Sequence, residues 1–535
     1  MSFKTALLGM TILGMAAPAM AQITIIEETT LSTIIVSGSR LDQTATEIGS
    51  SVSIISAETI EKLGFDFAID AVAAAPGVTI NQNGAFGGTA SVRIRGASSD
   101  QTLVLMDGVP INDPSGTGGG YNFAYLDTEN IERIEVLKGP QSTLWGSDAI
   151  GGVVAITTKR PEPGVGGSAF GEYGSFNTFR GGASIGGASE TGDFRLAATG
   201  VTTDGISKAD EANGNTEDDG YDSTTLSARG GLNLPRKIRL DGKLLYSKAM
   251  SEYDSYSGGA QGSTADGDES TESDSLTGNV SLKVPLFDDR LENLFVVGYS
   301  DITRKNFTDG DESYSAQGDR AIYRYQGTFT VNAANKLAFG AEREETTAND
   351  SDSTIDGLFA LYEFKPVEKL TLTGGVRVDD TDTFGSKTTG RVAAAYSATD
   401  QILLRASWGQ GFKAPSIYQS TYVCTFCGLT EPNTNLKPET SEAYDVGVEW
   451  NSPDGRAQAG IGVFHQETEN MIDFSYTAGY DNIAFVTSEG VELTGAYQFT
   501  NWLGVSANYA YIDAEDGNGD ALVRMPEHSG DVTVS

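Results

Sequence analysis

From about residue 165 to the end of the chain, apolar and polar residues alternate with a period of two over long stretches. Clear examples are Phe194–Thr199, Leu226–Asn233, Leu276–Val284 and Tyr323–Val331. This alternation predicts β-strands with one apolar and one polar face. Repeated over many strands, it favours a transmembrane antiparallel β-barrel with lipid outside and a wet lumen. A soluble β-sandwich would also alternate, but its strands are usually shorter and its turns come about every 8–12 residues.

The connections in this region also differ in length. Asp204–Asp222, Tyr253–Asp274 and Asn306–Asp319 are predicted to be long, acidic, Gly/Ser-rich loops, whereas Leu286–Asp289 is a short turn. Long loops on one side and short turns on the other are typical of outer-membrane barrels.

Before residue 160 the pattern predicts a small α/β unit instead. Two runs rich in β-branched residues, Ile131–Leu137 and Gly152–Thr158, flank a turn-rich centre and predict two strands. Ser56 is the predicted N-cap of a helix over Ala57–Leu63, and a second helix is predicted over Asp66–Ala75.

Composition narrows the class of protein. The chain has 535 residues, among them 23 Phe, 21 Tyr and 65 Gly, which suits a membrane barrel and not a disordered chain. The formal net charge of −37 repels polyanions, so no nucleic acid partner is expected. Most of this acidity is expected in solvated loops, and some of these loops are candidates for binding divalent cations.

The first 21 residues predict a signal peptide. Lys4 supplies a positive n-region, Ala6–Ala17 an apolar h-region, and Ala19-Met20-Ala21 a small-residue cleavage site. Beyond it, no apolar run of about 18 residues predicts a spanning helix. An exported protein of this kind is periplasmic, secreted or an outer-membrane barrel.

The sequence motifs of the α/β region resemble those of one family. IERIEVLKGP followed by STLWGSDAIGGVV, with PGV, IRG and VLMDGVPIND before them, is similar to the plug domain of TonB-dependent outer-membrane receptors. The closest similarity is to the cobalamin-transporter branch. Further motifs of the same family follow later in the chain: QGFKAPS, NTNLKPE (against a usual NPNLKPE), GVE and R-x-P. The resemblance therefore covers nearly the whole mature chain.

The resemblance implies a barrel of about 22 strands with the plug in its lumen, in the outer membrane of a Gram-negative bacterium. The expected domains are a signal peptide at 1–21, a leader at 22–45, the plug at 46–160 and the barrel at 165–535. Family barrels continue for several strands after R-x-P, whereas this chain stops at Asp531–Ser535, within an apparent strand. An open edge in lipid costs several kcal/mol per unsatisfied backbone group, so the C-terminal strands are expected to be missing from a fragment.

The resemblance also implies active uptake of a scarce nutrient, powered by TonB and its inner-membrane energising complex. A short β-prone segment stands at the family's TonB-box position, and such a segment can add a strand to a partner's sheet. Its residues are Ser32, Thr33, Ile34, Ile35, Val36 and Ser37. An ordinary N-terminal strand is the alternative. Outer-membrane lipid and the barrel-assembly machinery are further implied partners.

Two plug loops, Asn81–Thr89 and Asp113–Tyr121, are rich in Gly, Asn and Ser. In the resembled family the corresponding loops form the plug apex and touch substrate; a pair of mobile surface loops is the alternative. The substrate-binding candidates are Asn81, Gln82, Asn83, Phe86, Thr89, Ser115 and Thr117.

Two acidic stretches, Asn215–Tyr221 and Ser251–Asp268, are calcium candidates. Calcium takes six to eight oxygen ligands, and carboxylates of both stretches could supply them if the loops meet. These ligands would be Glu217, Asp219, Asp254 and Asp266. In the cobalamin-transporter branch, matching loops bind calcium and order the substrate site; here Glu217 replaces the usual Asp, and Asp268 is an alternative to Asp266. No cofactor is required, and solvated loops are the alternative to a structural calcium ion.

Cys424 and Cys427 form the motif CTFC, and the exported context favours a disulfide between them. No further Cys or His lies nearby to complete a metal site.

These observations predict a transporter and not an enzyme. The G-x-S-x-G match at 182–186 lies in alternating β sequence, not in the strand–turn–helix setting of a hydrolase. Cobalamin or a related corrinoid is the expected cargo, and a ferric siderophore is the main alternative. Haem is disfavoured because no His lies between Phe412 and Glu439. A passive porin-like channel would need an unplugged lumen, and a soluble periplasmic protein would need no lipid-facing strands.

Overall fold

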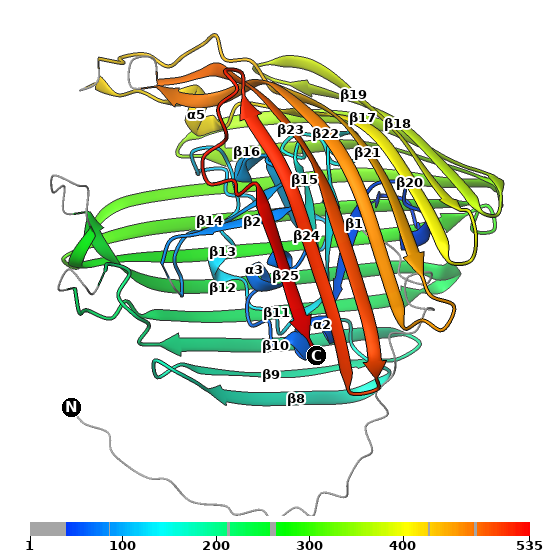
Figure 1. Cartoon of the computed structure of the whole chain (residues 1–535), viewed down its shortest axis with the longest axis horizontal. Helices are drawn as coiled ribbons and strands as arrows, with labels where there is room; N and C mark the ends of the chain where they lie inside the picture. Colours follow the sequence, from blue (N-terminus) through cyan, green and yellow to red (C-terminus); the bar gives the residue numbers. More distant parts are fainter. Residues whose placement is uncertain (1–38, 85, 211–214, 257–263, 426–427, 476–478) are drawn as a thin grey trace, which may run out of the picture.

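The computed structural model describes residues 39–84, 86–210, 215–256, 264–425, 428–475 and 479–535, without the side chains of 483 and 484. Within these residues an N-terminal α/β plug domain lies inside a large antiparallel β-barrel (Figure 1). The predicted mainly β fold class is therefore confirmed. None of the described helices is both long and apolar enough to cross a membrane.

The plug domain is built on a five-stranded sheet in the order β1-β6-β7-β4-β5, beside a separate β2–β3 hairpin. Strands β4 and β7 pair in parallel, and the other neighbours are antiparallel. The strands are β1 (Val52–Ser56), β2 (Val78–Gln82), β3 (Ala90–Ile94), β4 (Thr102–Met106), β5 (Val109–Pro110), β6 (Ile131–Lys138) and β7 (Gly152–Thr158). The helices are η2 (Ala45–Glu47), α2 (Ala57–Leu63), α3 (Ala68–Ala73), η3 (Ser99–Gln101), η4 (Phe123–Tyr125) and α4 (Ser142–Trp145).

The local predictions for the plug are largely confirmed. The two predicted strands are β6 and β7, and α2 starts where expected because the Ser56 hydroxyl accepts the Thr59 backbone N–H at 3.2 Å. The second helix, α3, is shorter than the predicted Asp66–Ala75. Its N-cap Phe67 has extended backbone angles, and Pro76 disfavours helical geometry at the residue before it.

The core of the plug consists of β-branched side chains on its central strands. Ile134, Val136, Val154 and Ile156 are at most 1% exposed. Burying each such side chain contributes roughly 1.5–3 kcal/mol. The same cluster includes three barrel residues, Val201, Tyr221 and Ala249. Plug and barrel therefore share one hydrophobic core on this side of the lumen.

In the described part of the chain, the barrel has eighteen strands in sequence order, from β8 to β25. The first nine are β8 (Gly164–Tyr173), β9 (Phe179–Ala188), β10 (Gly192–Thr203), β11 (Tyr221–Leu234), β12 (Ile238–Tyr256), β13 (Thr264–Leu286), β14 (Leu291–Thr308), β15 (Asp311–Asn332) and β16 (Asn335–Ala348). The last nine are β17 (Ser351–Val367), β18 (Leu370–Thr381), β19 (Gly385–Ser397), β20 (Ile402–Lys413), β21 (Glu439–Asn451), β22 (Ala457–Ser475), β23 (Gly479–Thr500), β24 (Leu503–Asp516) and β25 (His528–Val534). Two short helices, η6 (Pro235–Lys237) and α5 (Ile417–Thr421), lie between strands.

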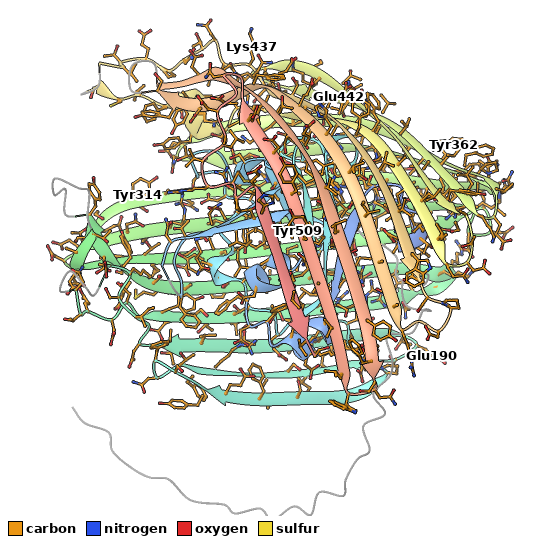
Figure 2. The ribbon with its side chains drawn as sticks, viewed as in Figure 1. Glu190, Tyr314, Tyr362, Lys437, Glu442 and Tyr509 are labelled. Carbon is orange, nitrogen blue, oxygen red and sulfur yellow. The ribbon has the colours of Figure 1, made fainter. Side chains whose placement is uncertain are left out.

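The predicted alternation sorts side chains to the two faces of the barrel wall. Phe194 and Leu196 on β10 are 42% and 50% exposed, whereas Ala197 and Thr199 face inward and are buried. Short turns join the strands at one end, where Glu190 lies, and Tyr314 lies at the opposite end (Figure 2). The short-turn end is the periplasmic one in barrels of this kind.

One expectation about the outer connections is wrong. Tyr253–Asp274 and Asn306–Asp319 were expected to be loops, but strands β12 to β15 continue through most of both stretches. Cross-strand pairs such as Glu269 with Thr308 and Thr271 with Asn306 show why. Polar residues satisfy their backbone groups in the ladder as well as apolar ones do, so acidic and Ser-rich composition did not end the strands.

The strand order returns from β25 to β8 to close the ring. Neither of these two strands contains a buried residue. The ring has fewer strands than the type of about 22 that the resemblance implies.

Candidate functional site

The first plug-apex loop lies at the outer mouth of the lumen. It connects β2 to β3 and is closed by a hydrogen bond from the Asn83 N–H to the Thr89 carbonyl at 3.0 Å. Gln82, Asn83 and Thr89 are exposed, and Asn81 is half-buried. Phe86 instead packs inward against the plug core, with its ring centroid 6.1 Å from that of Phe67.

The second apex loop contains one buried and one exposed candidate. Ser115 is 1% exposed and donates to Asp113 at 2.6 Å, while Asp113 also pairs with the barrel residue Arg304 at 2.7 Å. Thr117 is exposed, and its carbonyl accepts a hydrogen bond from Ser416 at 2.7 Å. Ser115 is thus held within a plug–barrel contact, whereas Thr117 faces the mouth.

An aromatic cluster that the sequence analysis did not identify stands beside Thr117. Its members are Tyr418, Tyr422, Phe474 and Tyr480, with ring centroids 5.2–6.0 Å apart. They come from α5, the residue after it, and the facing ends of β22 and β23. Tyr418 and Tyr422 lie in one short stretch of the chain, and Phe474 and Tyr480 in another more than fifty residues further on, so no single local motif in the sequence marks the cluster.

The two predicted calcium stretches do meet. The Thr216 N–H donates to the Asp266 carboxylate at 3.0 Å, and the Asp266 N–H donates to Asn215 at 3.3 Å. As a result, carboxylate oxygens of Glu217, Asp254 and Asp266 lie within 4.8 Å of one another.

Electrostatics within this acidic cluster favour an added cation. Asp254 is 6% exposed; its Oδ2 accepts the Ala209 N–H, whereas its Oδ1 has no hydrogen-bond partner among the described residues. Asp219, the fourth predicted ligand, is not among the three carboxylates that meet. Burial and the neighbouring Asp254 raise the pKa of Asp219 to about 6, against a hydrogen bond from the Lys208 N–H at 2.5 Å. Burial, Asp266 and Asp254 also raise the pKa of Glu217. Raised carboxyl pKa values mean that these charges lack sufficient counter-charge.

The acidic cluster and the first apex loop are in direct contact. Gly84 and Gly87 both have positive φ, at 75° and 70°. A Cβ at Gly84 would lie 2.5 Å from the Lys208 side chain, and one at Gly87 would lie 2.5 Å from the Ser251 hydroxyl. The apex loop therefore packs against the same segment that positions Asp219 and Asp254.

The described part of the leader is anchored to the barrel by Arg40. Its guanidinium pairs with Glu342 at 3.0 Å and lies over the rings of Trp145 and Phe359, at 4.1 and 4.8 Å. Glu342 is shared with Arg324 and Arg377. The Nε and Nη1 atoms of Arg40 have no hydrogen-bond partner among the described residues.

A second buried charge network joins the plug to strands β21 and β23 of the barrel wall. Arg95 makes two hydrogen bonds to Glu492, at 2.8 and 3.0 Å, and a salt bridge to Asp445 at 2.7 Å. Lys138 binds the same Glu492 at 2.9 Å. These side chains are 8% exposed or less. Nearby, Gln101 donates to Glu439 at 2.8 Å.

Two other predicted features fall partly or wholly outside the described residues. Cys424 is disulfide-bonded, but Cys427 lies outside the described part. The predicted TonB-contacting segment, residues 32–37, also lies outside the described part, which begins at Ser39.

The plug and the barrel each match a known family. Residues 44–153 match the TonB-dependent receptor plug domain, and residues 164–535 match the TonB-dependent receptor-like β-barrel. The vitamin B12 transporter BtuB of Photobacterium profundum is 27% identical over 563 residues, covering 99% of this chain and 86% of that protein.

Solved structures show the same fold at lower identity. The siderophore receptor PirA of Acinetobacter baumannii has a TM-score of 0.75 at 19% identity, covering 90% of this chain and 83% of that one. A mutant ferric enterobactin receptor PfeA of Pseudomonas aeruginosa, in complex with enterobactin, has a TM-score of 0.76 at 20% identity, covering 91% and 84%.

The α/β domain fills the lumen, and charged contacts hold it to the barrel wall. This arrangement defines a plugged barrel transporter. The chain belongs to the TonB-dependent receptor family. Members of this family are outer-membrane proteins of Gram-negative bacteria that move a small-molecule substrate with energy coupled through TonB. The protein is accordingly a transporter and not an enzyme.

Proposed function

We propose that this transporter takes up cobalamin or a related corrinoid across the outer membrane. The observation that carries the proposal is the 27% identity to a vitamin B12 transporter along 99% of the chain. The siderophore receptors are similar in fold at 19–20% identity, which concerns the scaffold and not the cargo.

The cargo would bind between the plug apex and the outer loops. The exposed apex residues Asn83, Thr89 and Thr117 offer polar contacts there, and the aromatic cluster around Tyr480 offers flat apolar surface. A site with a few placed polar groups beside aromatic rings suits a large, partly apolar ligand.

A calcium ion in the acidic cluster beside the plug apex would order this cargo site. Glu217, Asp254 and Asp266 provide three of the six to eight oxygens that the ion prefers. The Asp254 Oδ1 atom is a buried acceptor without a hydrogen-bond partner among the described residues. Leaving such an atom unpaired is costly, and a bound cation would remove that cost. Because the apex loop packs on Lys208 and Ser251, an ion here would also stiffen the apex.

Transport would then follow from TonB coupling. Cargo binding would expose residues 32–37 to the periplasm, and TonB would pair with them as an added strand. Its pull would rearrange the plug, which packs against the barrel wall in the lumen. Outer-membrane lipid would surround the barrel, and the barrel-assembly machinery would insert it.

The decisive experiment measures cobalamin binding to outer membranes containing the protein, with calcium or with EGTA. We expect calcium to tighten binding at least about tenfold, because ordering the loops beforehand removes part of the cost of binding. Asp254→Asn is expected to abolish this calcium effect. Asp288→Asn, in a short turn at the other end of the barrel, is the matched control and should behave like wild type.

Absence of cobalamin binding in both conditions would refute the corrinoid proposal. In that event a ferric siderophore, the main alternative, becomes the favoured cargo, and ferric enterobactin is the probe to test in the same membranes.

Calcium binding is expected to weaken in acid. Burial and the neighbouring Asp254 raise the pKa of Asp219 to about 6, so below that pH a proton on Asp219 reduces the negative charge beside Asp254, one of the three carboxylates that would bind the ion. Between pH 7 and pH 5 the affinity should fall about tenfold, since tight binding is then coupled to the release of that proton. Isothermal titration with calcium at both pH values measures this. Asp219→Asn should flatten the pH dependence, and equal affinity at both pH values in the wild type would contradict the prediction.

A further inference from the structure

Three cations stand in one row on the inner face of the barrel wall. Arg195 on β10 is directly opposite Arg229 on β11, and Arg229 is directly opposite Lys243 on β12. The row ends at Asn279 on β13, which is opposite Lys243. These positions alternate with the outward-facing Phe194 and Leu196, so the row faces the lumen. Directly opposed like charges on neighbouring strands destabilise a sheet unless something neutralises them.

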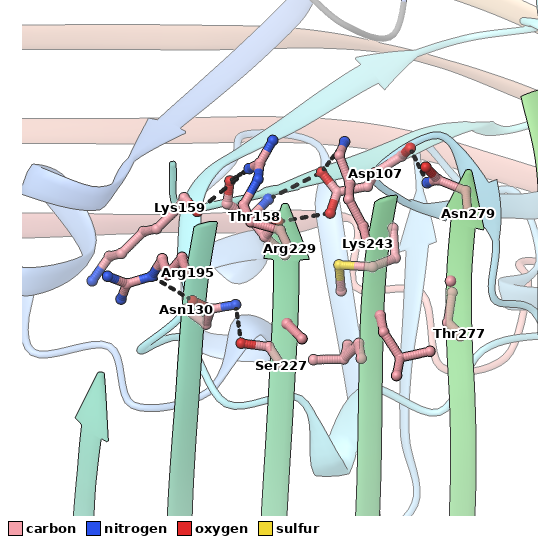
Figure 3. A pocket seen from close by; sticks show the side chains of 15 residues that line it. Asp107, Asn130, Thr158, Lys159, Arg195, Ser227, Arg229, Lys243, Thr277 and Asn279 are labelled. Carbon is pink, nitrogen blue, oxygen red and sulfur yellow. Dashed lines mark hydrogen bonds and ion pairs between the residues drawn. The ribbon is translucent and has the colours of Figure 1, made fainter. Parts of the chain in front are cut away.

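The row lines a pocket between the barrel wall and the plug (Figure 3). Asp107, Asn130, Thr158 and Lys159 form the plug side of the pocket. All four barrel strands approach their short periplasmic turns here, because Arg195 is the fourth residue of β10 and Lys243 the sixth of β12. The pocket therefore lies in the periplasmic half of the lumen, away from the outer mouth.

Two of the four cations around the pocket have acidic partners. Lys243 pairs with Asp107 at 3.0 Å, and Lys159 pairs with Glu129 at 3.9 Å. Arg195 and Arg229 form no salt bridge with any described residue. The chain has twice as many acidic as basic residues, yet none of the described carboxylates lies within ion-pair distance of this arginine pair.

The hydrogen-bond partners of the two arginines are all neutral, and Glu129 acts on Arg195 only from beyond ion-pair distance. Arg195 donates from Nε to the Asn130 side-chain carbonyl at 3.2 Å. Arg229 donates from Nη1 to the backbone carbonyls of Thr158 and Lys159, at 2.9 and 3.4 Å. Both arginines line the pocket (Figure 3), and the terminal nitrogens of Arg195 and the Nη2 and Nε atoms of Arg229 make no hydrogen bond to any described residue. Small polar groups of Ser227 and Thr277 line the same space.

We propose that Arg195 and Arg229 form an oxyanion-binding site, which takes a phosphate or carboxylate group of a small molecule. A bound oxyanion would neutralise the opposed pair and accept the unused N–H groups, for which planar guanidinium forks are well suited. The site is independent of the cargo at the outer mouth. Its ligand is either a free inorganic anion from the periplasm or an anionic group of a molecule that passes along the plug.

Isothermal titration of the purified full chain in detergent with inorganic phosphate tests the proposal. Saturable binding is expected, and Arg195→Gln/Arg229→Gln should weaken it at least about tenfold. Lys369→Gln is the matched control: it removes a cation from a periplasmic turn, where Lys369 pairs with Asp400 at 3.0 Å, and should leave the affinity unchanged. Each single Arg→Gln variant, and Arg195→Lys/Arg229→Lys, cover the case in which the double variant does not fold, and the Lys pair should bind more weakly than wild type.

A second titration with dimethyl phosphate distinguishes the two sources. Tighter binding of inorganic phosphate indicates a free ion, whereas tighter binding of the diester indicates a phosphate carried within a larger molecule. No saturable binding of either probe, or equal affinity in wild type and the Arg→Gln variants, would overturn the site. Neither result bears on cobalamin binding, which is measured separately.

Discussion

Replacing Glu492 with alanine is expected to loosen the plug inside the barrel. Glu492 is the shared partner of two buried cations, Arg95 at 2.8 Å and Lys138 at 2.9 Å. Its removal leaves both cations with one nearby carboxylate, Asp445. Breaking a buried ion pair by removing one partner typically costs about 3–5 kcal/mol, because the remaining charge is desolvated and uncompensated.

Hydrogen exchange followed by mass spectrometry measures this loss where it occurs. The opening free energy of β3, which Arg95 directly follows, and of β6, which ends at Lys138, should fall by about 3–5 kcal/mol. The barrel strands far from the site should be unaffected. Glu489→Ala is the control on the same strand, because that carboxylate is 63% exposed and pairs with His465, which is itself partly exposed, at 3.2 Å. Equal protection of β3 and β6 in Glu492→Ala and Glu489→Ala would contradict the prediction.

The same network shows what the sequence could and could not predict. Arg95 belongs to IRG, Lys138 to LKGP and Glu492 to GVE, the words that carry the family resemblance. The resemblance identified these three motifs but not that their charged residues are in contact, since the residues are separated by up to 397 positions in the chain. Only the position of the plug inside the barrel brings them together.

The period-two pattern predicted strands and their faces correctly, but it carries no information on register. The row Arg195–Arg229–Lys243 depends on which residues of three strands stand opposite each other. Turn lengths set that register, and a shift of one residue in β11 would turn Arg229 toward lipid. For the same reason, the sequence suggested that the acidic loops carry calcium ligands but left open whether Asp266 or Asp268 joins Glu217 and Asp254. The structure brings Asp266 to them.

Composition was a poor guide to where the outer strands end. The stretch Thr264–Asp274 is acidic and Ser-rich, and yet it is the first half of β13. Exposed and half-buried residues alternate from Thr264 to Asp268, and Ser273 is buried. Loop predictions from acidity fail wherever a neighbouring strand is long enough to supply backbone partners, as β12 and β14 are here.

Replacing Arg40 with alanine is expected to release the leader from the barrel without weakening the barrel itself. Arg40 holds the leader through its salt bridge to Glu342 and its contact with Trp145. A desolvated cation–π contact contributes about 2 kcal/mol and a charged hydrogen bond about 1.5–3 kcal/mol. Loss of either term raises the population of the released leader at least about tenfold.

The wall should tolerate this change because Arg40 is the surplus charge in its cluster. Arg40, Arg324 and Arg377 share the carboxylates of Glu342 and Asp379. When Arg40 is removed, Glu342 still pairs with the other two arginines. Two nitrogens of Arg40 already have no hydrogen-bond partner among the described residues. The contact is therefore strong enough to hold the leader and costs the barrel little when it breaks, as a releasable anchor next to residues 32–37 requires.

Limited proteolysis of the leader in cargo-free protein measures the release. Cleavage should be at least about tenfold faster in Arg40→Ala than in wild type, and capture by the periplasmic domain of TonB should rise in parallel. Lys336→Ala is the control, since Lys336 contacts the same leader only through the Asp42 carbonyl at 3.5 Å. Deleting residues 32–37 from Arg40→Ala should abolish capture while leaving the fast cleavage. If cleavage rates match between Arg40→Ala and Lys336→Ala, Arg40 is not what holds the leader, and its burial between Trp145 and Phe359 serves packing alone.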